Sequence, residues 1–184
     1  MDSNLRVNNT TKDSILIAMA AVLIVICSWI SIPLTVPVTL QTFAIFAVVG
    51  LLGLKRGTFA VMLYILLGTI GLPVFSGFRG GVGILLGNTG GYIVGFIFSA
   101  LVAGLITKYF GRKKAVLVIS MIAGLLVCYI FGTAWFINVY TNNTGEVGLI
   151  TALSWCVFPF IIPDAVKIGL AVIVVDRVAK YARY

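Results

Sequence analysis

Two ionisable residues, Asp164 and Lys167, stand inside a nearly continuous apolar run that extends from Trp155 to Val175. Residues three positions apart lie on one face of a helix, so this carboxylate and this ammonium group can touch. Ionisable groups deep in a membrane are costly, and they usually face a cavity or the interior of a helix bundle. We therefore interpret the pair as a ligand anchor. The alternative is a purely structural ion pair that joins two helices.

Further polar and aromatic residues extend this candidate site. Gln41 and Asn88 each offer hydrogen-bond donors and acceptors, and Arg79 can bind a carboxylate through two parallel hydrogen bonds. A solvated loop position explains Arg79 equally well. Apolar walls are expected from four aromatic residues: Tyr92, Trp135, Phe158 and Phe160. Together these groups suit a small, neutral-to-anionic ligand with amide-like N–H and C=O groups, an apolar part and a carboxylate.

The sequence offers little material for catalysis. It contains no histidine, and its three cysteines are scattered without CxxC spacing, which predicts small apolar core residues. There is no GxxxxGK[ST] motif, and the glycines at 81, 83 and 87 miss the GxGxxG spacing by one residue. We therefore predict a protein that is not an enzyme and has no cofactor or metal. Any energy for transport would come from a partner or an ion gradient.

The composition indicates which elements must position these residues. The 184 residues are 61% hydrophobic and only 10% charged, whereas soluble domains average roughly 25% charged residues. At about 20 apolar residues per membrane helix, the chain has room for six spans. We predict an all-α, multi-pass protein of the cell membrane, with one domain over residues 1–184 that forms a compact six-helix bundle. The predicted spans are 14–32, 38–54, 58–75, 90–107, 115–138 and 163–178.

Prolines, glycines and basic residues mark the connections between these spans. Pro33 and Pro37 should end the first span, and residues 55–57 should form a tight turn between the second and third. Residues 76–92 should be the least helical part, and the seven glycines between 77 and 91 suggest a mobile lid. A polar loop is expected at 138–146 and a short helix within 149–160. Pro163 is suited to the first turn of the last helix.

The distribution of positive charge predicts the orientation in the membrane. Lys and Arg collect on cytoplasmic loops, and cytoplasmic N- and C-termini place 11 of the 13 basic residues inside. Only Arg79 is then outside and only Lys167 within the membrane. At a rise of about 1.5 Å per residue, Asp164 would lie about 18 Å above Asp176, in the outer half of the bundle. The positive charge thus reflects topology, and no nucleic-acid surface is expected.

Three segments of the sequence resemble the BioY family, which comprises the biotin-specific S components of energy-coupling factor (ECF) transporters. The segments are Pro37–Thr42, Gly80–Tyr92 and Pro163–Lys167. Two departures are Asn88, where the family commonly has Pro, and Ile162-Pro163-Asp164, where it typically has Pro-Gly-Asp. The resemblance implies a six-helix bundle that binds biotin with high affinity from outside. It also implies partners, namely a transmembrane coupling protein and two ATP-binding-cassette ATPases.

The resemblance also implies roles for the candidate residues. Asp164 and Lys167 would meet the ureido ring of biotin, with Asn88 as a third partner and Gln41 near the mouth of the site. Tyr92 would pack on the apolar rings and chain, and Arg79 would face the carboxylate. The alternative function is a stand-alone or dimeric secondary carrier in which Asp164 exchanges a proton, although we find no internal repeat of the kind that carriers often show.

Overall fold

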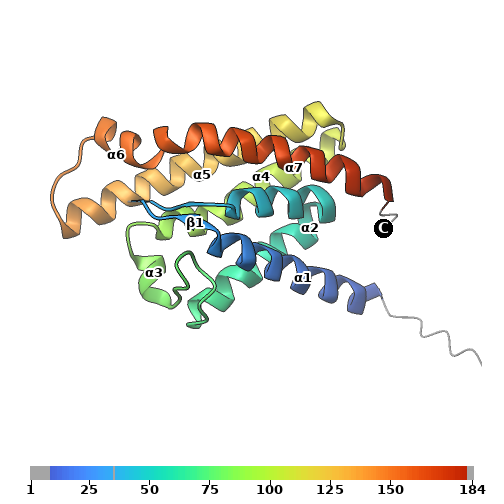
Figure 1. The fold of residues 1–184 in the computed structure, drawn as a ribbon, viewed down its shortest axis with the longest axis horizontal. Coiled ribbons are helices and arrows are strands. Elements are labelled where there is room, and N and C mark those ends of the chain that lie inside the picture. The colour runs from blue at the N-terminus through green and yellow to red at the C-terminus, as the bar shows by residue number, and fades with distance from the viewer. Residues whose placement is uncertain (1–8, 35, 182–184) are drawn as a thin grey trace, which may run out of the picture.

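The computed structural model describes residues 9–34 and 36–181, which form a helical bundle (Figure 1). Its long helices are α1 (Asn9–Trp29), α2 (Gln41–Thr69), α4 (Gly90–Phe110), α5 (Lys114–Asn143) and α7 (Ile161–Tyr181). The short elements are β1 (Ser31–Ile32), β2 (Val38–Thr39), α3 (Val82–Leu86), α6 (Leu149–Cys156) and the 3-10 helix η1 (Phe158–Phe160). Within the described residues, five helical stretches are long and apolar enough to cross a membrane.

Helix α2 folds back on itself and forms two arms of the bundle. Gly53 interrupts it with a non-helical φ of 79°. The side chain of Gln41 donates a hydrogen bond of 2.6 Å to the hydroxyl of Tyr64, although 23 residues of straight helix would separate them by about 35 Å. A Cβ on Gly57 would lie 2.8 Å from the Cα of Val49, so the bend needs glycine there. The two arms correspond to the predicted second and third spans, and the bundle therefore has six arms.

The connections at the ends of the first and third predicted spans differ from the prediction. Helix α1 begins earlier and ends at Trp29, because Ser31 and Ile32 pair antiparallel with Thr39 and Val38. The second span accordingly starts at Gln41 rather than at 38. The third predicted span ends at Thr69 rather than at 75, because Gly71 adopts a φ of 103° and Pro73 follows. Residues 70–75 are apolar because they fold back onto the bundle. Their composition therefore suggested a helix that continues to residue 75, although they are not helical.

Later elements follow the prediction with one clear error. Helix α5 continues to Asn143, so the first part of the predicted loop 138–146 is helical. Side-chain hydrogen bonds within this last turn, such as Asn142 Nδ2 to Asn138 Oδ1 at 3.1 Å, accompany the extension. The glycine-rich stretch is largely non-helical as predicted but contains α3. Residues 149–160 form α6 and η1, and Pro163 lies in the first turn of α7.

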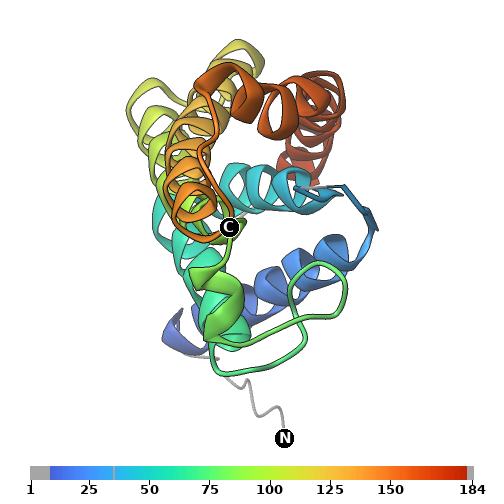
Figure 2. The ribbon, with the colours of Figure 1, turned by 90° about the vertical axis from the view of Figure 1, so that its left-hand side faces the viewer.

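The two ends of the bundle differ in composition. The start of α1, the bend of α2, the α4–α5 connection and the end of α7 share one end (Figure 1). Ion pairs tie this end together: Asp13 with Arg56 at 2.7 Å, and Asp176 with Lys114 at 3.3 Å. Figure 2 shows the opposite end, where the strands, α3 and α6 lie. The predicted tail before residue 9 and the basic residue Arg183 lie outside the described residues.

Candidate ligand-binding site

A pocket lies toward the end of the bundle that carries the strands, α3 and α6. It encloses about 700 Å³ of space free of protein atoms, including the part open to solvent. Its walls come from the β1–β2 hairpin, both arms of α2, residues 75–79, α3, α4, α5, α6, η1 and α7. Segments far apart in the sequence thus converge on one cavity.

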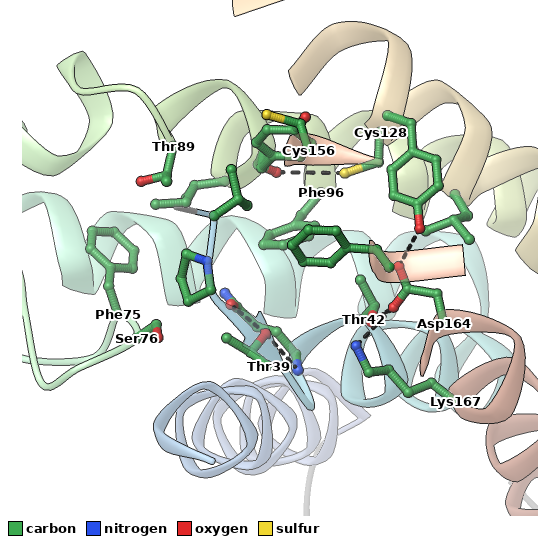
Figure 3. A pocket seen from close by; sticks show the side chains of 18 of the residues that line it. Thr39, Thr42, Phe75, Ser76, Thr89, Phe96, Cys128, Cys156, Asp164 and Lys167 are labelled. Atoms are coloured by element: carbon green, nitrogen blue, oxygen red, sulfur yellow. Dashed lines mark hydrogen bonds and ion pairs between the residues drawn. The ribbon is translucent and has the colours of Figure 1, made fainter. Parts of the chain in front are cut away.

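Asp164 lies at the centre of a hydrogen-bond network on one side of this pocket (Figure 3). Its Oδ1 accepts hydrogen bonds from Lys167 Nζ at 2.8 Å and from Thr42 Oγ1 at 3.0 Å, and its Oδ2 accepts one from the Tyr129 hydroxyl at 2.5 Å. The donors belong to α7, α2 and α5. Asp164 is only 2% exposed and Lys167 5%. The predicted contact between the two charges is therefore present, and it is part of a network across three helices.

The network leaves hydrogen-bonding capacity for a ligand. A carboxylate offers about four acceptor positions, and the three protein donors occupy three of them. The Lys167 ammonium has three N–H groups, of which one is committed to Asp164. Both residues line the pocket. The site therefore offers one acceptor position beside two N–H donors, which matches a ligand that carries an N–H group next to a C=O group.

Gln41 lines the same pocket but is largely engaged with the protein. Its Nε2 donates to the Tyr64 hydroxyl at 2.6 Å, and its Oε1 accepts from Thr39 Oγ1 at 3.3 Å. Both partners are buried. Gln41 thus ties the β1–β2 hairpin to the second arm of α2, and one N–H and one acceptor position of its amide remain for a ligand.

The other predicted residues divide into those that reach the pocket and those that do not. Tyr92 lines it, with its hydroxyl 2.8 Å from Thr133 Oγ1. Arg79 also lines it and donates from Nε to the Ser76 carbonyl at 3.2 Å. Asn88 is not among the lining residues, whereas its neighbour Thr89 is. In Figure 3, Phe75, Ser76 and Thr89 lie on the side of the pocket opposite Asp164 and Lys167.

The aromatic walls are partly as expected. Phe160 lines the pocket, but Phe158 and Trp135 do not. Phe158 is exposed. Trp135 instead donates from Nε1 to the Gly87 carbonyl at 3.1 Å, so it supports the glycine-rich stretch from α5. Phe75 and Phe96, which the sequence did not single out, supply further apolar wall.

Sequence reasoning missed the two hydroxyl donors of Asp164 and two thiols. Tyr129 is one of seven tyrosines and lies 35 residues from its partner. The only available signal was a hydroxyl group inside the apolar fifth span. Thr42 directly follows Gln41 and was visible only as its neighbour. Cys128 and Cys156 are buried as predicted, but both also line the pocket.

Comparison with known proteins gives a consistent result. The whole chain, residues 1–184, matches the model of the BioY family. A protein named biotin transporter BioY from Thermotoga maritima is 42% identical over 161 residues, which is 86% of this chain and 90% of the relative. A probable biotin transporter BioY from Pyrococcus horikoshii is 38% identical over 167 residues, or 90% of this chain and 95% of the relative.

A solved structure resembles this fold over nearly its full length. It is the crystal structure of the S-component for biotin from an ECF-type ABC transporter. The TM-score is 0.84 with 28% sequence identity, and the match covers 98% of this chain and 95% of the other. The likeness extends over all six arms of the bundle and the elements that surround the pocket.

Proposed function

The chain belongs to the BioY family of membrane transporters, and on that premise we propose that it is the biotin-binding membrane subunit of a vitamin uptake transporter. The observation that carries the proposal is the buried Asp164–Lys167 pair on the wall of a small-molecule pocket. The family and the named relatives are transporters and not enzymes, as the sequence predicted.

The chemistry of the pocket supports biotin as the ligand. The ureido ring of biotin carries two N–H groups and one C=O group, so it needs an acceptor beside a donor. We place an N–H group on the free acceptor position of Asp164 and the C=O group on a free N–H of Lys167. The apolar rings and chain then pack on Phe75, Tyr92 and Phe160.

The carboxylate of biotin belongs at the other side of the pocket in this arrangement. Arg79 lines the pocket and has guanidinium N–H groups beyond the one that bonds to Ser76. An arginine fork binds a carboxylate through parallel hydrogen bonds. Asn88 does not line the pocket, and it becomes a partner only if the glycine-rich stretch moves as a lid, which is also part of the proposal. Thr89, next to it, already faces the cavity.

The orientation is also part of the proposal. Basic residues flank the bend of α2, the α4–α5 connection and the end of α7, all at one end of the bundle. The positive-inside rule then places this end in the cytoplasm. The pocket lies toward the other end, so biotin would enter from outside.

Uptake would require energy that this chain does not supply. The sequence has no P-loop, and the neighbour of known structure is a component of an ECF-type ABC transporter. We therefore propose that a transmembrane coupling protein and two ATP-binding-cassette ATPases act with this chain. The secondary carrier is less well supported, because proton exchange at Asp164 would remove the negative charge that its buried ion pair with Lys167 needs.

Purified protein in liposomes tests the function. We expect tight biotin binding, no biotin accumulation under a proton or sodium gradient, and ATP-dependent accumulation once the coupling protein and ATPases are reconstituted with it. Desthiobiotin, which keeps the ureido ring but lacks the sulfur, serves as a matched competitor and should also bind. Absence of biotin binding by the folded protein would refute the proposed ligand. Gradient-driven uptake by the chain alone would favour the secondary carrier.

A further inference from the structure

A second hollow lies at the end of the bundle opposite the ligand pocket. It encloses about 520 Å³ of space free of protein atoms, part of it open to solvent. One wall is the bend of α2, residues 53–55, and the other is formed by residues 104, 107 and 108 of α4 and by Arg112 beyond its end. The bend packs directly on α4, since a Cβ on Gly104 would lie 2.9 Å from the Cα of Leu54.

All charged residues that line this hollow are cationic: Lys55, Lys108 and Arg112. Within residues 9–34 and 36–181, none of the three lies within 4.0 Å of a carboxylate oxygen. The acidic residues at this end are engaged elsewhere, Asp13 with Arg56 and Asp176 with Lys114 and Lys180. The hollow therefore concentrates positive charge without an anion to balance it.

Interactions within the protein account for only part of this positive charge. Lys108 lies in the last turn of α4, where the helix dipole favours a cation. Arg112 donates from Nη1 to the Leu51 carbonyl at 3.2 Å, which braces the bend and leaves its other N–H groups available. Lys55, however, lies in the first turn of the second arm of α2, where the dipole disfavours a cation. An anion in the hollow would stabilise all three.

The surroundings of the hollow indicate the chemical class of this anion. Tyr109 and Phe110 follow Lys108 directly and are 73% and 72% exposed, and exposed aromatic residues gather at the membrane–water interface. Leu105 and Phe98 are exposed on the bilayer side of α4, four and eleven residues before Tyr109. Leu105 also lies three residues before Lys108, which lines the hollow, so Leu105 and Phe98 continue the exposed face of α4 from the edge of the hollow toward the membrane centre. A phosphate head with acyl chains fits both features.

We propose that this hollow binds the phosphate headgroup of an anionic phospholipid, with the acyl chains along Phe98 and Leu105. Basic pockets between membrane helices are suited to anionic lipid heads, and each Lys or Arg near the surface contributes about 1 kcal/mol, or about fivefold in affinity. Such a lipid would bridge the bend of α2 and the end of α4.

Native mass spectrometry of the purified protein tests the proposal, with phosphatidylglycerol and phosphatidylcholine of equal chain length as probes. We expect phosphatidylglycerol to bind more tightly. The triple variant Lys55→Gln, Lys108→Gln and Arg112→Gln should lose roughly a hundredfold in affinity, and Lys55→Gln alone about fivefold. The matched control removes three charges that do not line the hollow: Lys12→Gln, Lys113→Gln and Arg177→Gln. It should lose much less affinity than the triple variant of the hollow, because these three side chains do not line the hollow.

Three results would overturn the proposal. An equal loss in both triple variants would show that diffuse charge attracts the lipid and that no site exists. Equal binding of phosphatidylglycerol and phosphatidylcholine would show that the headgroup is not recognised. Displacement of phosphatidylglycerol by millimolar inorganic phosphate would assign the hollow to a soluble anion.

Discussion

At the scale of single residues, the central feature is a carboxylate with three protein donors. Asp164 accepts from Lys167, Thr42 and Tyr129, which lie on three different helices. A buried polar network of this kind fixes its members in position before a ligand arrives. The pocket is therefore pre-organised around Asp164, and a ligand adds to an existing network.

The spacing of Asp164 and Lys167 made their contact predictable, because neighbours on one helix face follow from sequence alone. The donors Thr42 and Tyr129 were not predictable in this way. Their positions depend on how α2 and α5 pack against α7, and single hydroxyl groups in apolar spans carry no periodic signal. Asn88 is the opposite case. The sequence singled it out as a polar residue within a glycine-rich stretch, but it does not line the pocket.

Substitutions within this network should weaken biotin binding. Asp164→Asn and Lys167→Ala each remove a charged partner that we place on the ureido ring, and a hydrogen bond to a charged group contributes about 1.5–3 kcal/mol, or roughly tenfold to a hundredfold in affinity. Tyr129→Phe keeps the ring but removes one donor to Asp164, so we expect a loss of about tenfold or more. Isothermal titration of biotin into purified protein measures all three.

Two control variants accompany this titration. Tyr140→Phe removes a hydroxyl from α5 outside the pocket, and Asp176→Asn removes a carboxylate from α7 outside it. Both should bind biotin as the parent protein does. Affinity near the parental value in Asp164→Asn and Lys167→Ala would show that the pair has only a structural role.

At the scale of helices, close packing of α4 on α5 shapes the wall of the pocket. A Cβ on Gly91 would lie 2.2 Å from the Cβ of Trp135, and one on Gly132 would lie 2.3 Å from Cδ1 of Tyr92. Small residues let membrane helices approach closely. Here they set Tyr92 against the cavity, where its hydroxyl pairs with Thr133.

Gly132→Ala should therefore displace the Tyr92 ring. Overpacking of this kind costs about 1–3 kcal/mol, so we expect a lower thermal unfolding temperature together with weaker biotin binding. Gly169→Ala on α7 is the matched control, since its Cβ would meet nothing within 4 Å. Thermal unfolding in detergent compares the two. An unchanged unfolding temperature in Gly132→Ala would contradict the packing argument.

The limits of the helices were predicted less well than their existence. Hydropathy records which residues can lie in a membrane, whereas backbone hydrogen bonds decide where a helix ends. Helix α5 therefore continues through polar residues to Asn143. The chain after Thr69 leaves the helix although residues 70–75 are mostly apolar. A bend between the two arms of α2 was predictable, because Gly and basic residues interrupt the apolar pattern there, but its position was not: the break lies at Gly53, whereas the predicted turn at residues 55–57 is helical.

At the scale of the whole molecule, the two ends of the bundle carry different chemistry. One end holds the ligand pocket, the β1–β2 hairpin and the glycine-rich stretch with α3. The other holds the bend of α2, the basic hollow and the ion pairs of Asp13 and Asp176. The charge distribution in the sequence already predicted this polarity.

The orientation of this polarity in the membrane can be measured by cysteine labelling in intact cells. Thr144→Cys introduces a thiol at the pocket end, and Lys113→Cys introduces one at the basic end. Thr144 and Lys113 are both exposed in the parent protein. The native cysteines among the described residues are buried, so the parent protein is the control for background labelling. Because basic connections stay in the cytoplasm, a membrane-impermeant maleimide should label Thr144→Cys at once and Lys113→Cys only after permeabilisation. The reverse pattern would place the pocket on the cytoplasmic side, and biotin could then not enter it from outside.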